Sequence, residues 1–103
     1  KETKTFEKNE ILKVKKPDYL GASMWELKLR DHPISAKIVD HDWLLRFQSR
    51  KVDVRPGDAL SVILQTEINY GFQGDEISVH YHIIKVIGIV PDASPEQTDL
   101  LPS

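Results

Sequence analysis

The sequence predicts a mainly β domain, a small antiparallel barrel with one short helix and the element order β-β-β-α-β-β. Four segments alternate apolar and polar residues with a period of two, which is typical of strands that bury one face, and only the segment 40–50 has the helical period. A Pro-Gly-Asp turn follows the helical segment. Closure into a barrel is favoured because it removes exposed sheet edges. A flat sheet with the helix on one face is the alternative.

The first half of the chain contains three expected strands. The segment 11–15 alternates apolar residues with lysines and ends at Pro17. The segments 25–30 and 34–38 alternate in the same way, and the Asp-His-Pro turn between them breaks the ladder. These two segments therefore predict a β-hairpin.

A short helix is expected over 40–50. Asp40 is placed to act as the N-cap, and Trp43, Leu44 and Phe47 form a narrow apolar stripe. An acid–base cluster is the alternative interpretation of Asp40 and the two residues after it, but capping and the helix dipole explain the same residues. A helix of this length is marginal in isolation, so we expect it to pack on the sheet.

The second half begins with Arg55-Pro56-Gly57-Asp58, for which we expect a type II turn. Proline presets φ at the second position of such a turn, and glycine allows a positive φ at the third. The segment 60–68 then alternates as a strand, and 69–76 connects it to the last strand. From Ile83 onward both faces of that strand are apolar. Either a β-bulge shifts the register near Ile83-Ile84 or both faces are covered.

We expect one folded domain over 10–90, with a flexible lead-in at 1–9 and a proline-containing tail or linker at 91–103. Apolar residues make up 40% of the chain and charged residues 29%, which is ordinary for a soluble globular domain. Because the chain begins at Lys1 rather than methionine, we expect it to be a piece of a longer protein or a processed product.

Composition also bounds the function. A net charge of -2 argues against nucleic-acid binding, and the lack of cysteine excludes disulfides, thiolate nucleophiles and cysteine-based zinc sites. No segment resembles a signal peptide or is long enough to cross a bilayer, so we expect a cytoplasmic protein without membrane contact. No phosphate-binding loop, dinucleotide fingerprint or catalytic carboxylate pair is present, so we expect no enzymatic activity and no cofactor.

Four residues are candidates for binding. His80 and His82 project from one face of a strand, as imidazoles do in some metal sites. The sequence fixes no third ligand, so we expect no metal site. Tyr70 and Phe72 lie in a glycine-containing loop, where exposed aromatic side chains can anchor a partner. The alternative is that both fold back and close an open end of the barrel.

We therefore expect a non-enzymatic binding or assembly module that contacts other domains of its parent chain or a second copy of itself. The apolar residues of the last strand favour a two-fold dimer through that strand, with the bulge as the rival explanation. The alternative function is a small-ligand or metal sensor that uses the 69–76 loop and the strand face of His80 and His82.

Five stretches of the sequence together resemble a domain of uncharacterised bacterial proteins. These stretches are Trp25-Glu26-Leu27, 34–40, 43–47, 54–60 and 81–86. In those proteins the domain forms the C-terminal part and follows a larger N-terminal region. The resemblance implies a bacterial, cytoplasmic, barrel-like domain over 11–90, excised from a longer chain. It implies no assigned activity and no site residue.

Overall fold

The computed structural model describes residues 2–17 and 24–91, and it confirms a mainly β domain with one short helix and a closed five-stranded barrel. The elements follow the expected order β-β-β-α-β-β. They are β1 (Glu2–Lys16), β2 (Met24–Leu29), β3 (His32–Ile38), α1 (His41–Gln48), β4 (Ala59–Tyr70) and β5 (Glu76–Val90). Apart from Pro91, the expected tail lies outside the described residues.

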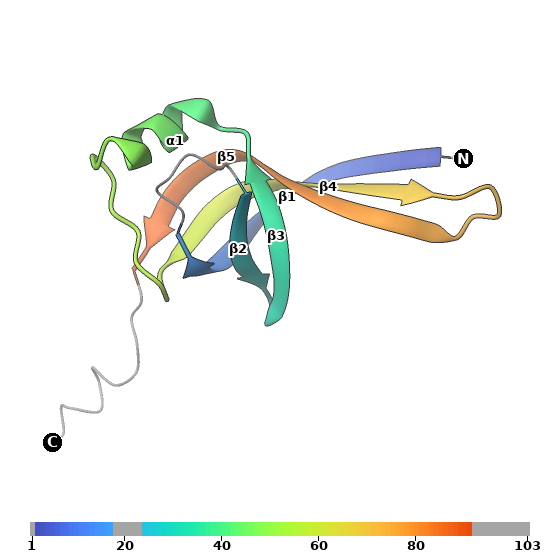
Figure 1. Cartoon of the computed structure of the whole chain (residues 1–103), viewed down its shortest axis with the longest axis horizontal. Coiled ribbons are helices and arrows are strands. Elements are labelled where there is room, and N and C mark those ends of the chain that lie inside the picture. Colours follow the sequence, from blue (N-terminus) through green and yellow to red (C-terminus); the bar gives the residue numbers. More distant parts are fainter. Residues whose placement is uncertain (1, 18–23, 92–103) are drawn as a thin grey trace, which may run out of the picture.

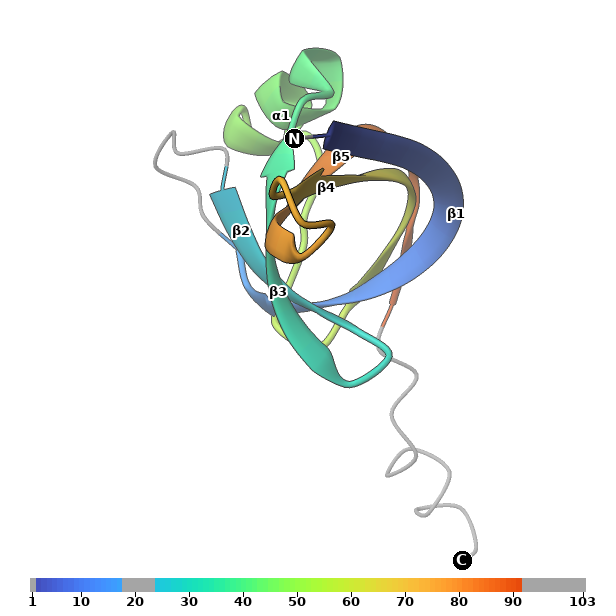
Figure 2. The same ribbon diagram turned by 90° about the vertical axis from the view of Figure 1, so that its right-hand side faces the viewer.

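Around the barrel the strands are ordered β1-β2-β3-β5-β4, and β4 closes the ring onto β1. Figure 2 shows this ring end-on. Every neighbouring pair is antiparallel except β3 and β5, which pair in parallel over 36–38 and 81–83. The expectation of a wholly antiparallel barrel is therefore wrong, because a ring of five strands cannot alternate direction all the way round. The arrangement is a five-stranded Greek-key barrel of the OB type, a fold that hosts many functions.

Three of the strands continue past the barrel as an extended arm (Figure 1). The arm consists of residues 2–8 of β1, 64–70 of β4 and 76–82 of β5, and its base overlaps the barrel, where Leu64 is buried and residues 81–82 pair with β3. Glu2 lies opposite Tyr70, so the expectation of a flexible lead-in is wrong for residues 2–9. Charged and hydroxyl side chains dominate this stretch, and Phe6 is its one large apolar residue. The alternation of apolar and polar residues that marks a strand is therefore missing.

Three register shifts interrupt the pairing of β5 with β4, one near the tip of the hairpin and two in the apolar half of β5. Leu64 lies opposite Ile83 while the preceding residue of β4 lies opposite Lys85, so Ile84 is the extra residue of the first bulge. Of the two alternatives for this strand, the bulge near Ile83-Ile84 is the one that the structure shows. A second register shift makes Ile87 an extra residue as well, and its side chain is 53% exposed. The two bulges explain how this strand can be apolar at nearly every position without a second core.

The helix α1 packs on the barrel through three aromatic rings. Phe47 lies 5.0 Å from Trp25, measured between ring centroids, and stacks on Trp43 at 5.5 Å with an angle of 8° between the planes. The two tryptophan rings meet edge to face at 5.7 Å. All three side chains are buried. This cluster supplies the packing that a helix of eight residues needs in order to be stable.

Asp40 joins the helix to β5. One carboxylate oxygen accepts a hydrogen bond from the backbone N–H of Trp43 at 3.1 Å, which confirms the expected N-cap. The other oxygen accepts from the backbone N–H of Val86 at 3.0 Å. Val86 lies between the two bulges of β5, so the carboxylate binds a backbone group at the most irregular part of the sheet. At its other end the helix stops short of the expected boundary, because Arg50 adopts a positive φ of 64°.

The turn at 55–58 has the expected geometry. Gly57 has a φ of 97°, and the N–H of Asp58 donates to the carbonyl of Arg55 at 3.0 Å. The N–H of Gly57 also donates to the carbonyl of Val14 at 3.0 Å, which joins the turn to β1. The turn is therefore fixed both by its own hydrogen bond and by the barrel wall.

Replacing Gly57 by alanine is expected to lower the free energy of unfolding by about 1–2 kcal/mol, because a Cβ atom is disfavoured at this positive φ. Gly88→Ala is the matched control. A Cβ atom at Gly88 would meet nothing within 4 Å. Alanine restricts the unfolded chain equally at both positions, so this entropy effect is the same in the two variants. Urea denaturation of both variants provides the measurement. Equal stabilities for the two variants would show that the backbone conformation of Gly57 is not the determinant.

Candidate binding surfaces

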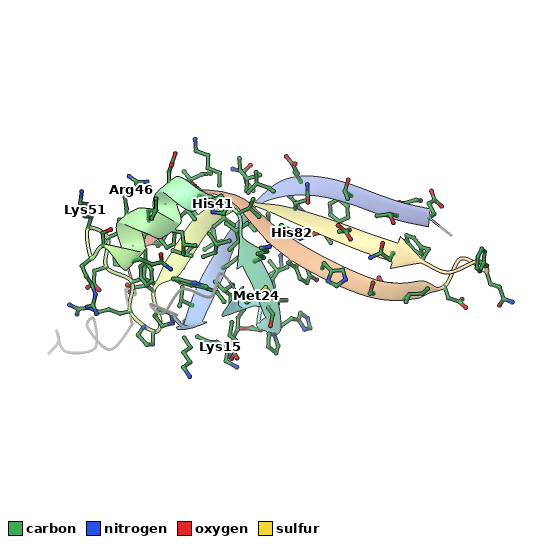
Figure 3. All side chains as sticks on the ribbon, turned by 45° about the horizontal axis from the view of Figure 1, so that its top comes forward. Lys15, Met24, His41, Arg46, Lys51 and His82 are labelled. Atoms are coloured by element: carbon green, nitrogen blue, oxygen red, sulfur yellow. The ribbon has the colours of Figure 1, made fainter. Side chains whose placement is uncertain are left out.

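The four candidate residues lie on two different parts of the arm. Tyr70 and Phe72 are at its tip, where the hairpin joins β4 to β5. His80 and His82 are on β5, near the base of the arm, and Figure 3 labels His82 there. The structure therefore separates the two pairs that the ligand-sensor alternative combined.

The hairpin at the tip leaves its aromatic side chains outside the barrel. Two backbone hydrogen bonds close the loop, from Gly71 N–H to the Asp75 carbonyl at 2.8 Å and from Gly74 N–H to the Gly71 carbonyl at 3.1 Å. Phe72 is 90% exposed. Tyr70 is partly buried, and the Nζ of Lys4 lies 5.7 Å from the centroid of its ring. The idea that these aromatics close an end of the barrel is wrong, because the loop lies at the far end of the arm (Figure 1).

One face of the arm continues the inward-facing pattern of the barrel wall. We call it the inner face; its residues are Glu2, Lys4, Phe6 and Lys8 of β1, Thr66, Ile68 and Tyr70 of β4, and Val79 and Tyr81 of β5. Only Tyr81 packs against the core cluster. Phe6 is 51% exposed, so no described residue covers the middle of this face. The inner face thus carries mainly apolar and aromatic side chains on β4 and β5, whereas on β1 charged residues flank Phe6.

The opposite face of the arm, the outer face, is polar. Asn69 accepts a hydrogen bond from the Thr3 hydroxyl at 2.7 Å and donates to the Ser78 hydroxyl at 3.0 Å, which links all three strands. Gln65 donates to Glu7 at 3.4 Å in a second cross-strand contact. The arm is therefore amphipathic, with a hydrogen-bonded face suited to water and an apolar face suited to a partner.

A notch opens between β3 and β5 where the two strands separate. It has a volume of about 620 Å³ and is lined by Met24, His32, Pro33, Ile34, Ser35, Lys37, Val79, His80, Tyr81 and His82. Figure 3 shows Met24 and His82 at the base of the arm. The Nδ1 atom of His82 is buried and has no hydrogen-bond partner among the described residues. Three histidines and a lysine thus converge on one concavity.

The described residues hold no group of three or more His, Cys, Asp or Glu side chains that could bind a metal ion. His80 and His82 share the outer face, as their spacing predicts. His32 lines the same notch without completing a ligand set. The chemistry available in the notch is therefore hydrogen bonding and positive charge.

The possible acid–base cluster after β3 has a structural role. Asp40 uses both carboxylate oxygens on backbone N–H groups, and His41 and Asp42 are exposed at the start of the helix. In the described ranges, 2–17 and 24–91, no helix is long and apolar enough to cross a membrane.

Sequence reasoning missed the inner face and the notch. The signal for the inner face is present as Lys4-Thr5-Phe6-Glu7-Lys8, in which one aromatic residue occupies the only apolar position. The notch has no sequence signal, because Lys37 and His82 become neighbours only through the parallel pairing of β3 with β5.

No protein-family model, no curated protein and no solved structure matches this chain. The resemblance to a C-terminal domain of bacterial proteins therefore stays a prediction. Function is inferred from the surfaces of the molecule alone.

Proposed function

We propose that this domain is a non-enzymatic assembly module that binds a second copy of itself through the inner face of the arm. The observation that carries the proposal is Phe6, a large apolar side chain that is 51% exposed on the inner face, beside the apolar and aromatic residues of β4 and β5. An amphipathic sheet normally buries its apolar face against another layer. The arm is a single layer, so a partner must supply the second one.

The charges of β1 favour a second copy as that partner. Along the inner face the order is Glu2, Lys4, Phe6 and Lys8. A two-fold axis that crosses the strands between Lys4 and Phe6 places Glu2 of each copy over Lys8 of the other. Such an isologous interface is self-complementary, and it places Lys4 of each copy over the Phe6 ring of the other, as in a cation–π contact. The next residue on this face, Glu10, is already paired with Arg30 at 2.9 Å and adds no repulsion.

The size of the inner face indicates a weak dimer. Three strands about 4.8 Å apart, with seven residues of about 3.3 Å each, give a face of roughly 14 by 23 Å. The side chains make the accessible surface larger than this flat outline, so two such faces together bury about 1,000 Å² of accessible surface. That area is the lower limit for a specific interface. We therefore expect self-association at micromolar rather than nanomolar concentration.

The last strand is a weaker candidate for the interface than the sequence suggested. Ile89 packs against the core, so a charge at that position would test folding and not association. Ile87 and Val90 remain exposed on the barrel wall and form the rival surface. The bulges of β5 already explain its apolar composition, which removes the main reason for a dimer through this strand.

Sedimentation equilibrium at high micromolar concentration tests the proposal. The wild-type chain should form dimers, and Phe6→Glu should weaken dimerisation at least about tenfold, because a charge replaces a central apolar contact. Ile87→Lys is the matched control, since it places a charge at an equally exposed apolar site on the barrel wall. A monomeric wild type would refute the proposal. If Ile87→Lys loses the dimer and Phe6→Glu keeps it, the interface is formed by the last strand instead.

A further inference from the structure

The notch between β3 and β5 exists because their parallel pairing is short. Pairing runs from Ala36 with Tyr81 to Ile38 with Ile83, and no pairing joins β3 residues 32–35 to β5 residues 76–80. The two strand edges that border the notch therefore have backbone groups available for hydrogen bonds with a ligand. The inner face of the arm, by contrast, presents only side chains.

The side chains of the notch are basic. Lys37 and His82 are direct partners across the parallel pair, and His80 lies two residues along β5 on the same face. His32 lines the notch as well. None of the lining residues that the structure describes is acidic. Lys37 therefore supplies positive charge with no acidic lining residue to offset it, which favours anionic ligands.

Two carboxylates flank the notch without lining it. Glu26 lies opposite Ser35 on the neighbouring strand β2. Glu67 lies opposite His80 on β4 and accepts a hydrogen bond from Asn69 at 3.3 Å. Each is one strand away from the notch, on the same sheet face as its partner, and neither lines the ligand space.

Hydrogen-bond donors complete the set. Ser35 and Tyr81 contribute hydroxyl groups to the lining. Because Nδ1 of His82 is buried without a partner among the described residues, the polar contacts of this ring depend on its Nε2 edge. Lysine, imidazole and hydroxyl donors are the groups that proteins use to bind phosphate and carboxylate oxygens.

We propose that the notch binds a small molecule through a phosphate or carboxylate group, with Lys37 and His82 as the central contacts. A volume of about 620 Å³ exceeds that of a lone oxyanion and lies in the range of small-molecule sites. The charged group of the ligand lies against Lys37, His80 and His82, and its remainder contacts Met24 and Tyr81. This site is separate from the inner face and does not depend on dimerisation.

Backbone amide NMR tests the proposal with inorganic phosphate and with acetate as probes, at constant ionic strength. Each titration is run on the wild type and on Phe6→Glu at concentrations where sedimentation shows a monomer, so that self-association does not affect the result. We expect at least one probe to cause saturable shifts at Ser35, Lys37 and His82. Lys37→Gln should weaken the binding of that probe at least about fivefold, as should His82→Gln, because each removes one charge-assisted contact.

Lys13→Gln is the matched control, since it removes the same charge from an exposed position on β1. Its affinity for the probe should stay within about twofold of the wild type. Shifts that do not saturate with either probe, or an equal loss in Lys13→Gln, would overturn the proposal in favour of general charge attraction. Binding of a thymidine oligonucleotide with no response to either small anion would overturn it in favour of nucleic-acid binding.

Discussion

Replacing Phe47 by alanine is expected to lower the free energy of unfolding by about 3–5 kcal/mol. The side chain is fully buried between Trp25 and Trp43, at centroid distances of 5.0 and 5.5 Å. Its removal leaves a cavity that two rigid indole rings cannot fill. The helix also loses its central anchor, and a helix of eight residues has little stability of its own.

Urea denaturation followed by tryptophan fluorescence measures this loss directly, because both tryptophans adjoin the cavity. Leu45→Ala is the matched control. It lies on the same helix but is 61% exposed, so we expect a change below about 0.5 kcal/mol. A domain of this size has a total stability of about 5–15 kcal/mol, so Phe47→Ala could leave little of it. Similar losses in the two variants would show that helix propensity, and not the aromatic cluster, holds α1 in place.

Replacing Asp40 by alanine is expected to cost about 2–4 kcal/mol, because two backbone N–H groups lose their acceptor at once. Loss of the cap at Trp43 contributes about 0.5–2 kcal/mol. The N–H of Val86 is left without its partner in a partly buried position, which contributes about 1–3 kcal/mol more. The second contribution distinguishes this residue from an ordinary N-cap.

Asp40→Asn separates the two contributions. Asparagine is as good an N-cap as aspartate, but it has one oxygen where the carboxylate has two. The variant should therefore lose about half as much stability as Asp40→Ala. Asp42→Ala, in the first turn of the same helix, should cost only about 0.3–1 kcal/mol through the helix dipole. An Asp40→Ala loss no larger than that of Asp42→Ala would show that the bond to Val86 contributes nothing.

Features of the fold that depend on local sequence are predictable. The cap at Asp40, the turn at Gly57 and the bulge at Ile84 each follow from residue types within a few positions of one another. The first half of β1 is not predictable in this way. Its residues are polar on the outer face and mostly charged on the inner face, and only the pairing with β4 makes them a strand. Tertiary pairing there outweighs the local signal.

The candidate sites show the same division. The spacing of His80 and His82 is enough to predict that both lie on one strand face, since side chains in a strand repeat with a period of two. Their most important neighbour, Lys37, comes from a strand more than forty positions away and pairs in parallel. One parallel pair is required in a closed ring of five strands, because an odd number of strands cannot alternate in direction. Which residues face each other in that pair cannot be predicted from the sequence.

The pairing of β1 with β4 also bears on the order in which the protein folds. Glu2 meets Tyr70, so the ladder of β1 with β4 joins residues more than sixty positions apart in the sequence. Contacts of such separation form late, because a long loop must close before they contribute any stability. Until β4 arrives, β1 is an unpaired strand and a template for pairing with other chains. The charges at Lys4, Glu7 and Lys8 oppose that pairing. The charged residues that remove the strand pattern from the sequence therefore also protect the chain from aggregation while it folds.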